Sequence, residues 1–341
     1  MTRLRGVLIG CGHISRSHLP GWAASPDAEI VAVCDLDRAR AEARAAEFGI
    51  ARAYADPAAA LDTERPDFVD IATRPETHHE LIALAAGRGV HVLCQKPLAP
   101  SLAAAEAMAA ACRRAGVRFM VTEMWRWLPW YRAIAARLAE GEIGPVHYCR
   151  FQGGRHAFRR QRPINDTQPY FADMPMLLIY EMLIHWIDTA RYLFGEVDGV
   201  YARTARLNPV IAGEDVALLV LSHAGGVTTL LDHSWGSAPE RRERRRRDAN
   251  VLVEGRDGSY RFDDADGVLV RLDLDGDETV IGRYKEAGDP FLAAFAACLG
   301  HFAACLRAGA PFESEIEDNL RTLAVTLAAY ESARTNQVVR V

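Results

Sequence analysis

Two side chains in this sequence could move or stabilise a proton at a reacting carbon, and the first is Lys96. It lies in the run Cys94-Gln95-Lys96-Pro97, directly after a short apolar segment. If that segment is a parallel strand, Lys96 lies at the carboxyl edge of its sheet, where open α/β sheets bind their ligands. Taken alone, a lysine at a strand end is more often an ordinary solvated residue.

The second side chain is His185, which follows Glu181 by four residues in a segment with helical periodicity. That spacing places both side chains on one face of a helix. A carboxylate beside an imidazole orients the ring and stabilises its charged form, which suits proton transfer. A histidine satisfied within a helix, beside surface acids, is the plainer alternative.

A glycine turn near the start of the chain predicts a site for a dinucleotide. Gly10-Cys11-Gly12-His13-Ile14-Ser15 follows the first apolar run and opens the first helical segment. Gly10 allows a tight turn, and Gly12 lets a pyrophosphate approach the backbone at a helix N-terminus. Ser15 takes the third glycine position of this fingerprint and is small enough for helix–strand packing.

An acid at the end of the second apolar run supports the same site. Asp35 lies where a carboxylate accepts the ribose hydroxyls of the adenosine, about 20 residues beyond the turn. Its charge repels the 2′-phosphate of NADP, so NAD is favoured. Arg38 could supply a cation, so NADP is not excluded.

The elements that must position these residues alternate between apolar runs and Ala-rich segments in the first third of the chain. This alternation predicts right-handed crossovers and a doubly wound parallel sheet, a Rossmann domain over residues 1–122. We expect strands at 5–9, 29–34, 68–72, 90–94 and 117–122, helices at 14–25, 38–48, 78–88 and 101–115, and a short strand and helical turn around 54–61.

Residues 123–341 show a different pattern, which predicts an α+β domain with a mostly antiparallel, open sheet. Gly225-Gly226 and Asp257-Gly258 have the chemistry of hairpin turns. We expect helices at 130–140, 175–194, 290–308 and 316–335, and strands at 146–152, 197–206, 215–222, 226–235, 250–254, 259–263 and 267–273.

Composition narrows the class of protein further. A formal net charge of -5 argues against a nucleic-acid partner. The seven cysteines form no C-x-x-C pair, which predicts neither a metal site nor a disulfide framework. No apolar run predicts a signal segment or a membrane span. We therefore expect a cytoplasmic protein without a membrane partner.

With these motifs in order, the chain resembles the Gfo/Idh/MocA family of NAD(P)-dependent oxidoreductases over nearly its whole length. The resemblance is carried by the glycine turn, Ala72-Thr73 with His78, Gln95-Lys96-Pro97-Leu98, Gly141-Glu142-Ile143-Gly144-Pro145-Val146, His185-Trp186-Ile187-Asp188, and Asp318-Asn319-Leu320 with Tyr330-Glu331-Ser332-Ala333. It implies a Rossmann domain, then a larger sheet domain whose open face makes homodimers or homotetramers.

The resemblance also implies residue roles. Lys96 would lie close to the reacting carbon, and His185 with Glu181 would complete the catalytic group. The cofactor would be lined by Gly10, Gly12, His13, Ile14, Asp35, Arg38, Thr73, His78, Gln95 and Lys96. Two residues depart from the family pattern: Gln95 replaces the glutamate of E-K-P, and Glu181 replaces an aspartate. Either Lys96 or His185 could be the base.

Substrate contacts are expected from the second domain and its boundary. Polar groups with aromatic platforms suit a polyhydroxylated ring, although such residues are also ordinary in loops. The candidates are Arg126, Trp127, His156, Asn165, Tyr170 and Trp235.

The leading interpretation is a dehydrogenase that transfers a hydride between a nicotinamide cofactor and a hydroxyl or carbonyl carbon of a sugar, polyol or inositol-like substrate. One alternative is a glycosidase that retains NAD and would turn over without net NADH. Another is a non-catalytic sensor that binds the dinucleotide to regulate a partner. The presence of both Lys96 and His185 argues against the sensor, because binding alone needs neither.

Overall fold

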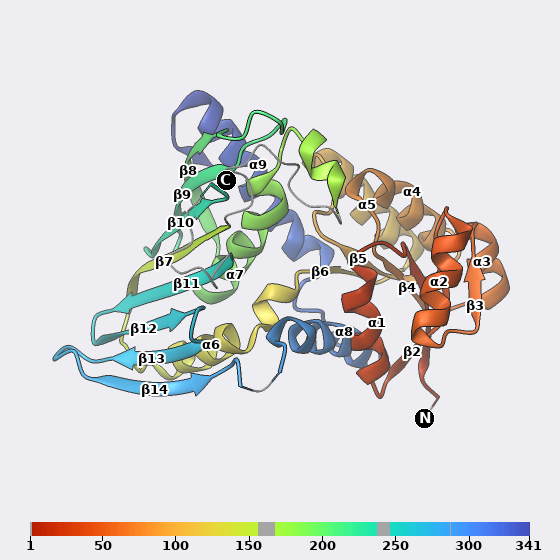
Figure 1. Ribbon diagram of the computed structural model, residues 1–341, viewed down its shortest axis with the longest axis horizontal. Coiled ribbons are helices and arrows are strands. Elements are labelled where there is room, and N and C mark those ends of the chain that lie inside the picture. Colours follow the sequence, from red (N-terminus) through yellow and green to blue (C-terminus); the bar gives the residue numbers. More distant parts are fainter. Residues whose placement is uncertain (1, 156–167, 237–245, 287) are drawn as a thin grey trace. The chain divides into compact units, whose positions relative to one another are not determined.

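The computed structural model describes residues 2–155, 168–236, 246–286 and 288–341. The chain forms two compact units (Figure 1). Unit 1 consists of residues 1–127 and 291–323, and unit 2 of residues 128–290 and 324–341. Each unit is described by itself below.

Unit 1 contains a six-stranded parallel sheet in the order β3-β2-β1-β4-β5-β6. Its strands are β1 (Leu4–Ile9), β2 (Ala28–Cys34), β3 (Arg52–Tyr54), β4 (Phe68–Ile71), β5 (His91–Gln95) and β6 (Phe119–Thr122). The connecting helices are α1 (Ser15–Ala24), α2 (Arg38–Phe48), α3 (Pro57–Glu64), α4 (Pro75–Ala86) and α5 (Leu102–Ala115). The prediction of a doubly wound Rossmann sheet is confirmed.

The helix ends follow local chemistry that the sequence already shows. Asp37 caps α2 by accepting from the backbone of Ala39 and Arg40, and Gly49 ends it with φ 67°. Ser101 caps α5 in the same way. Side-chain caps satisfy donors that the first turn leaves open, and glycine adopts positive φ without a Cβ clash.

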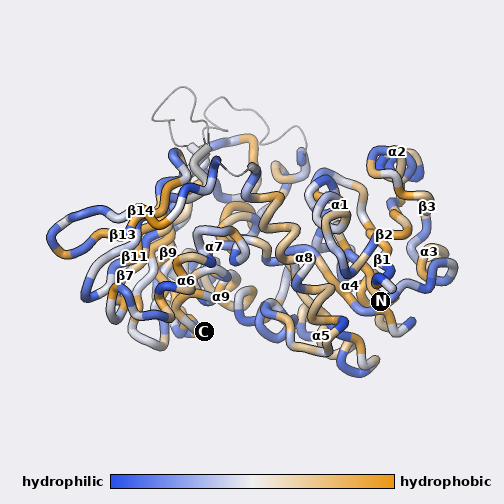
Figure 2. The backbone as a smooth tube through the Cα atoms, turned by 90° about the horizontal axis from the view of Figure 1, so that it is seen from below, coloured by the Kyte–Doolittle hydropathy of each residue, from blue (hydrophilic) through white to orange (hydrophobic). Residues whose placement is uncertain are grey.

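A long apolar helix, α8 (Pro290–Ala308), completes the core of unit 1 from Phe291 onward. Within it, Phe302 packs edge-on against Trp22 and Phe68, with ring centroids 6.2 and 5.3 Å away, and Phe295 lies 5.1 Å from the ring of His18. Figure 2 shows the hydrophobic character along this helix. By length and composition α8 could cross a membrane, so the expectation that no stretch is apolar enough is wrong. Its buried face explains the composition, because a core helix needs the same residues as a membrane span.

Unit 2 contains a nine-stranded sheet in the order β14-β13-β12-β11-β7-β10-β9-β8-β15. All neighbouring strands run antiparallel except β7 and β10. Its strands are β7 (Val146–Arg155), β8 (Val197–Ala205), β9 (Val216–His223), β10 (Thr228–Ser234), β11 (Arg246–Gly255), β12 (Gly258–Asp263), β13 (Val268–Leu272), β14 (Glu278–Arg283) and β15 (Val339–Arg340). The prediction of a mostly antiparallel second sheet is confirmed.

Helices α6 (Pro129–Glu140) and α7 (Ile184–Phe194) pack on this sheet. Trp130 of α6 stacks on Phe262 at 4.4 Å, and Trp186 of α7 lies 5.7 Å from Phe151, measured between ring centroids. Helix α9 (Ile316–Thr335) contributes Ser332, whose hydroxyl accepts from the backbone of Ala202 in β8. The described residues also contain three short 3₁₀ or π segments, Met124–Trp127 in unit 1 and Pro169–Asp173 and Ile179–Leu183 in unit 2.

Three elements of unit 2 differ from the sequence-based expectation. The expected helix over 175–194 is instead a π-helical segment, Ile179–Leu183, followed by α7. Strand β14 was not expected, because none of its residues is buried and the sequence shows no alternation of buried and exposed positions there. Strand β15 was also missed, since its two residues are too few to form a pattern.

Candidate functional site

The glycine turn after β1 has the backbone shape that a dinucleotide loop requires. Gly10 has φ +105°, and a Cβ there would lie 2.6 Å from the carbonyl oxygen of Ala72, so only glycine fits. A Cβ on Gly12 would meet nothing within 4 Å, so this side of the loop is open. Arg44 holds the loop from behind by donating to the carbonyls of Cys11 and Gly12, both at 3.1 Å.

Helix α1 begins directly after this loop without a side-chain cap. The uncapped first turn presents the positive end of the helix dipole to the open side of Gly12, where a pyrophosphate would approach. His13 is exposed and Ile14 half-buried on the same stretch. The loop therefore fits the phosphates of a dinucleotide.

Asp35 lies at the end of β2, beside the loop. Its carboxylate accepts from the backbone N–H of Cys11 and of Asp37, both at 2.9 Å, and its side chain is 11% exposed. The guanidinium of Arg40 lies 3.6 Å from Asp35 Oδ1. Arg38 instead pairs with Glu42 in its own helix at 2.8 Å. Arg40, rather than the Arg38 suggested from the sequence, is therefore the cation close enough to offset the charge of Asp35.

Thr73 and His78 follow β4, and the side chain of His78 is held by backbone groups. Its fully buried ring contacts two carbonyl oxygens, that of Leu98 at 3.0 Å and that of Thr73 at 3.2 Å. Burial lowers the pKa of His78, although both carbonyl contacts act in the opposite direction. His78 thereby ties the half-buried Thr73 to the segment after Lys96, and Thr77 donates to the Thr73 hydroxyl at 2.8 Å.

Lys96 follows β5 and is half-buried, as expected for a residue at the carboxyl edge of this sheet. The preceding Gln95 is 4% exposed, and its side-chain oxygen accepts from the backbone N–H of Lys96 at 2.9 Å. Its amide nitrogen lies 2.8 Å from Nε2 of His18. Gln95 is therefore held at both ends inside unit 1.

One acid at this edge was not anticipated from the sequence, namely Glu123. Strands β5 and β6 pair Gln95 with Thr122, so Lys96 and Glu123 are the next residues of neighbouring strands. Burial raises the pKa of Glu123 to about 7, while the charges of Lys96 and Arg126 oppose that rise. The sequence feature that could have pointed to Glu123 is its position immediately after the apolar run at 117–122.

Two residues expected to contact substrate, Arg126 and Trp127, have side-chain partners within unit 1. Arg126 is buried and donates to the carbonyl of Glu313 at 2.7 Å and to Asp318 at 2.9 Å. The buried ring of Trp127 lies 5.5 Å from that of His301. Arg126 therefore holds the segment after β6 to the 313–318 region, and Trp127 packs it against α8.

In unit 2, His185 is the second residue of α7, and Glu181 lies in the preceding π segment. A π turn has more residues than an α turn. The four-residue spacing of Glu181 and His185 therefore does not place them on one helix face as it would in an ideal α-helix. Such π segments are frequent at functional sites. His185 is 7% exposed, and its carbonyl accepts from the Thr189 hydroxyl at 2.7 Å.

The π segment is fixed by a buried acid, Glu214. Its carboxylate accepts from the backbone N–H of Ile179 at 2.9 Å and from the hydroxyl of Tyr330 at 2.6 Å. The same hydroxyl accepts from the backbone of Tyr180 at 3.1 Å. Burial raises the pKa of Glu214, and the hydrogen bond from Tyr330 opposes that rise. This network sets where the helix of His185 begins.

The remaining expected substrate residues are distributed as follows. Trp235 is almost fully buried, with its backbone N–H donating to the carbonyl of Asp215 at 2.8 Å. Tyr170 is half-buried and accepts from Gln168 at 3.1 Å. His156 and Asn165 lie outside the described residues.

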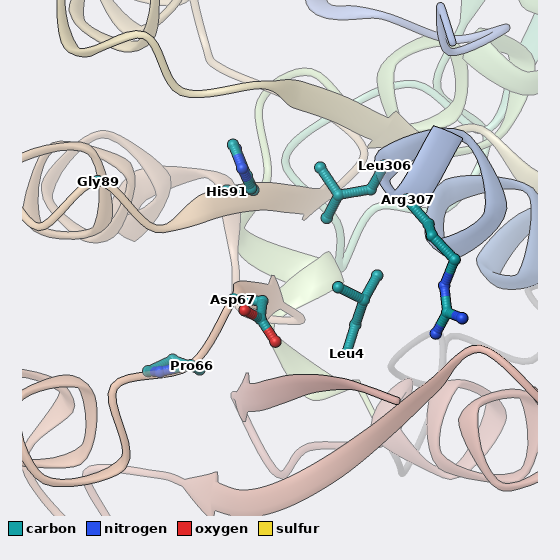
Figure 3. Close-up of a pocket in the computed structure, with 7 residues that line it drawn as sticks. All are labelled: Leu4, Pro66, Asp67, Gly89, His91, Leu306 and Arg307. Atoms are coloured by element: carbon teal, nitrogen blue, oxygen red, sulfur yellow. The ribbon is translucent and has the colours of Figure 1, made fainter. Parts of the chain in front are cut away.

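A pocket in unit 1 lies at the opposite, amino edge of the parallel sheet (Figure 3). Arg307 on its rim donates to the carbonyls of Thr2 and Asp27, both at 3.0 Å. Because ligands of open α/β sheets bind outside the carboxyl ends of the strands, this pocket is not the dinucleotide site. The carboxyl edge instead brings together Gly10, Gly12, Asp35, Thr73, Gln95, Lys96 and Glu123.

Comparison with known families agrees with this arrangement. Residues 4–123 match a family model described as an oxidoreductase family with an NAD-binding Rossmann fold. Residues 131–261 match the Gfo/Idh/MocA C-terminal domain.

Individual relatives extend over almost the whole chain. A D-apiose dehydrogenase of Paraburkholderia graminis is 42% identical, covering 99% of this chain and 90% of the relative. A second, of Rhizobium rhizogenes, is 34% identical and covers 99% and 98%. The crystal structure of an oxidoreductase from Agrobacterium radiobacter, in complex with NAD+, L-tartaric acid and magnesium, is 33% identical with a TM-score of 0.90, covering 99% and 98%. The chain therefore belongs to the Gfo/Idh/MocA family of NAD(P)-dependent oxidoreductases.

Proposed function

We propose that this protein is an NAD-dependent dehydrogenase that oxidises a carbinol carbon of a small sugar or polyol, with D-apiose as the first substrate to test. The observation that carries the proposal is the shared edge of the unit 1 sheet, where Lys96 follows β5 on the same side as the glycine turn and Asp35. D-apiose comes first because two relatives at 42% and 34% identity are D-apiose dehydrogenases.

NAD supplies the two-electron acceptor for the hydride of the carbinol carbon when it is bound. The loop from Gly10 to Ile14 would hold its phosphates through backbone N–H groups and the dipole of α1. Asp35 would accept the ribose hydroxyls, and Thr73 and Gln95 would line the same edge. The negative charge of Asp35 favours NAD over NADP, although Arg40 lies 3.6 Å from it.

Proton transfer is assigned to the chain's own residues. As the C–H bond breaks and the hydride leaves, the hydroxyl proton passes to His185 and the C–O bond becomes a carbonyl. Lys96 as a cation stabilises the negative charge that develops on the oxygen. A neutral lysine is also an acceptable base, so the reverse assignment remains the second candidate.

The outer face of the unit 2 sheet supports a homodimer or homotetramer. Leu218 is 40% exposed there, and the partly buried Val220 and Leu230 share its face. Apolar side chains on an open sheet face favour burial against a second copy. The seven cysteines are all free thiols, which fits a cytoplasmic location.

The first experiment measures NADH and NADPH binding to the cofactor-stripped protein by nicotinamide fluorescence. We expect tighter binding of NADH, followed by NADH production from NAD with D-apiose in a panel that includes D-xylose and inositols. Binding without turnover on the whole panel would favour a sensor. Turnover of glycosides without net NADH would favour the NAD-retaining glycosidase. Failure to bind either nucleotide would remove the proposal.

A further inference from the structure

In unit 1 a continuous series of buried, hydrogen-bonded polar groups links Asp70 of β4 to the backbone of Lys96. One carboxylate oxygen, Oδ2, accepts from Nε1 of Trp22 at 2.6 Å and contacts Nδ1 of His18 at 2.8 Å. His18 and Trp22 lie one turn apart on α1, and all three side chains are buried in the core. A buried carboxylate is costly unless donors satisfy it, so these two contacts anchor Asp70.

The chain continues from His18 through Gln95 to Lys96. The side-chain nitrogen of Gln95 lies 2.8 Å from Nε2 of His18, and its oxygen lies 2.9 Å from the backbone nitrogen of Lys96. A backbone N–H can only donate, so the oxygen of the Gln95 amide must face Lys96. The NH₂ group must then face His18, and Nε2 of His18 must accept. The proton of the neutral ring therefore sits on Nδ1 and is donated to Asp70.

We propose that His18 is a positioning residue for Lys96, acting through Gln95 as a neutral imidazole with its proton on Nδ1. The fixed amide holds the backbone of Lys96, and with it the direction in which the lysine leaves the strand. Asp70 accepts separately from His18 and from Trp22, and neither Asp70 nor Trp22 reaches Gln95. The effect on turnover rests on the proposed dehydrogenase function, whereas the tautomer and the fixed backbone do not.

This arrangement gives a physical reason for glutamine at position 95. A carboxylate there would present an oxygen to Nε2 of His18 while still accepting from Lys96. Both contacts would then need one more proton, held either by that carboxyl or by Nε2 of His18. Glu123 is a further acid beside Lys96. Gln95 and His18 are therefore a matched pair, because the amide donates to His18 and accepts from Lys96 without an additional proton.

The tautomer is tested by nuclear magnetic resonance of the full-length protein labelled with nitrogen-15 in histidine. We expect the wild-type signal of His18 to show a bare Nε2 and a protonated Nδ1. A protonated Nε2 in the wild type would overturn the proposal, and this measurement needs neither substrate nor activity.

The positioning role is tested by His18→Phe with Trp22→Phe as its matched control. Each variant removes one of the two donors to Asp70 and keeps an aromatic ring in the core. Only His18→Phe removes the acceptor of the Gln95 amide. We expect it to shift the backbone amide resonance of Lys96 and, on an oxidised sugar, to lower kcat roughly ten- to a hundred-fold. Trp22→Phe should leave both nearly unchanged.

Each outcome decides the proposal separately from the function. Equal shifts of the Lys96 resonance in the two variants would overturn the positioning role. A selective shift together with a bare Nε2 supports it, even if no sugar in the panel is oxidised. If His18→Phe does not fold, Gln95→Met cuts the chain at its other end and should move the same resonance.

Discussion

Lys96 and Glu123 are the first residues beyond two neighbouring parallel strands, because Gln95 of β5 pairs in register with Thr122 of β6. The carboxyl of Glu123 is fully buried, and it interacts electrostatically with the ammonium of Lys96. The proposed catalytic lysine therefore has an acid beside it within unit 1. The proton on that acid sets how much negative charge faces Lys96.

This relationship predicts how the stability of the protein depends on pH. Burial raises the pKa of Glu123 from 4.5 to about 7 in the folded protein. Its contribution to the free energy of unfolding is thus fully present below pH 4.5 and is lost as the pH rises through about 7. Because one pKa unit corresponds to about 1.4 kcal/mol, the loss is on the order of 3 kcal/mol.

Urea unfolding of the wild type and Glu123→Gln at pH 4.5 and pH 8 measures this contribution. We expect the free energy of unfolding of the wild type, minus that of Glu123→Gln, to fall as the pH rises, because the glutamine does not titrate. Glu317→Gln is the control, because Glu317 is an exposed acid paired with Arg113 at 2.6 Å. If both variants showed the same pH dependence, the buried acid would not be its source.

Cofactor choice should depend on Asp35 more than on its neighbour Asp37. Asp35→Ala removes the carboxylate that repels a 2′-phosphate and leaves Arg40 near the same place. We expect KM for NAD to rise about tenfold, which corresponds to about 1.4 kcal/mol, and KM for NADP to fall. Asp37→Ala also removes an acid 3.6 Å from Arg40, but it acts as the cap of α2. Asp37→Ala should therefore lower Tm without changing the preference for NAD over NADP. An unchanged preference in Asp35→Ala would mean that Asp35 does not contact the ribose.

The parts of the site that could be predicted from sequence are those whose signal is local. The glycine turn, Asp35 and Lys96 each follow an apolar run, and their type and position along the chain already imply the carboxyl edge of a sheet. The same holds for α2, where Asp37 and Gly49 mark both ends.

The parts that could not be predicted depend on contacts between distant segments. Arg126 resembles a substrate contact in the sequence, but Asp318 and the carbonyl of Glu313 occupy it nearly two hundred residues later. Glu214 and Tyr330 together fix the π segment before His185, and no periodicity in residues 175–194 encodes that interruption. The link from His18 to Gln95 likewise depends on which strand α1 covers.

His185→Asn should lower kcat by roughly 10² to 10⁴, the usual contribution of general acid–base catalysis. Lys96→Met should also lower kcat, and the double variant should lose less than the product of the two single losses if both residues act on the same oxygen. Thr189→Val is the control, because it removes a hydroxyl that donates to the carbonyl of His185 without touching the imidazole. Wild-type turnover of His185→Asn at every pH would show that His185 is not the base.

Tyr330→Phe should destabilise unit 2 because it removes a hydroxyl that serves two buried partners. The hydroxyl donates to Glu214 at 2.6 Å and accepts from the backbone of Tyr180 at 3.1 Å. Leaving such groups unsatisfied costs about 1–3 kcal/mol. Tyr201→Phe is matched to it, since Tyr201 donates to Asn336 at an exposed site, and it should change the free energy of unfolding by less than about 0.5 kcal/mol.

The pH dependence of the Tyr330→Phe effect identifies its cause. Burial already raises the pKa of Glu214, and loss of the Tyr330 hydrogen bond should raise it further. A raised acid pKa makes the folded state less favourable as the pH rises through that value. Thermal and urea unfolding at pH 5 and at pH 8 should therefore show a larger loss of stability at the higher pH. An equal loss at both values would assign the effect to packing rather than to the carboxylate of Glu214.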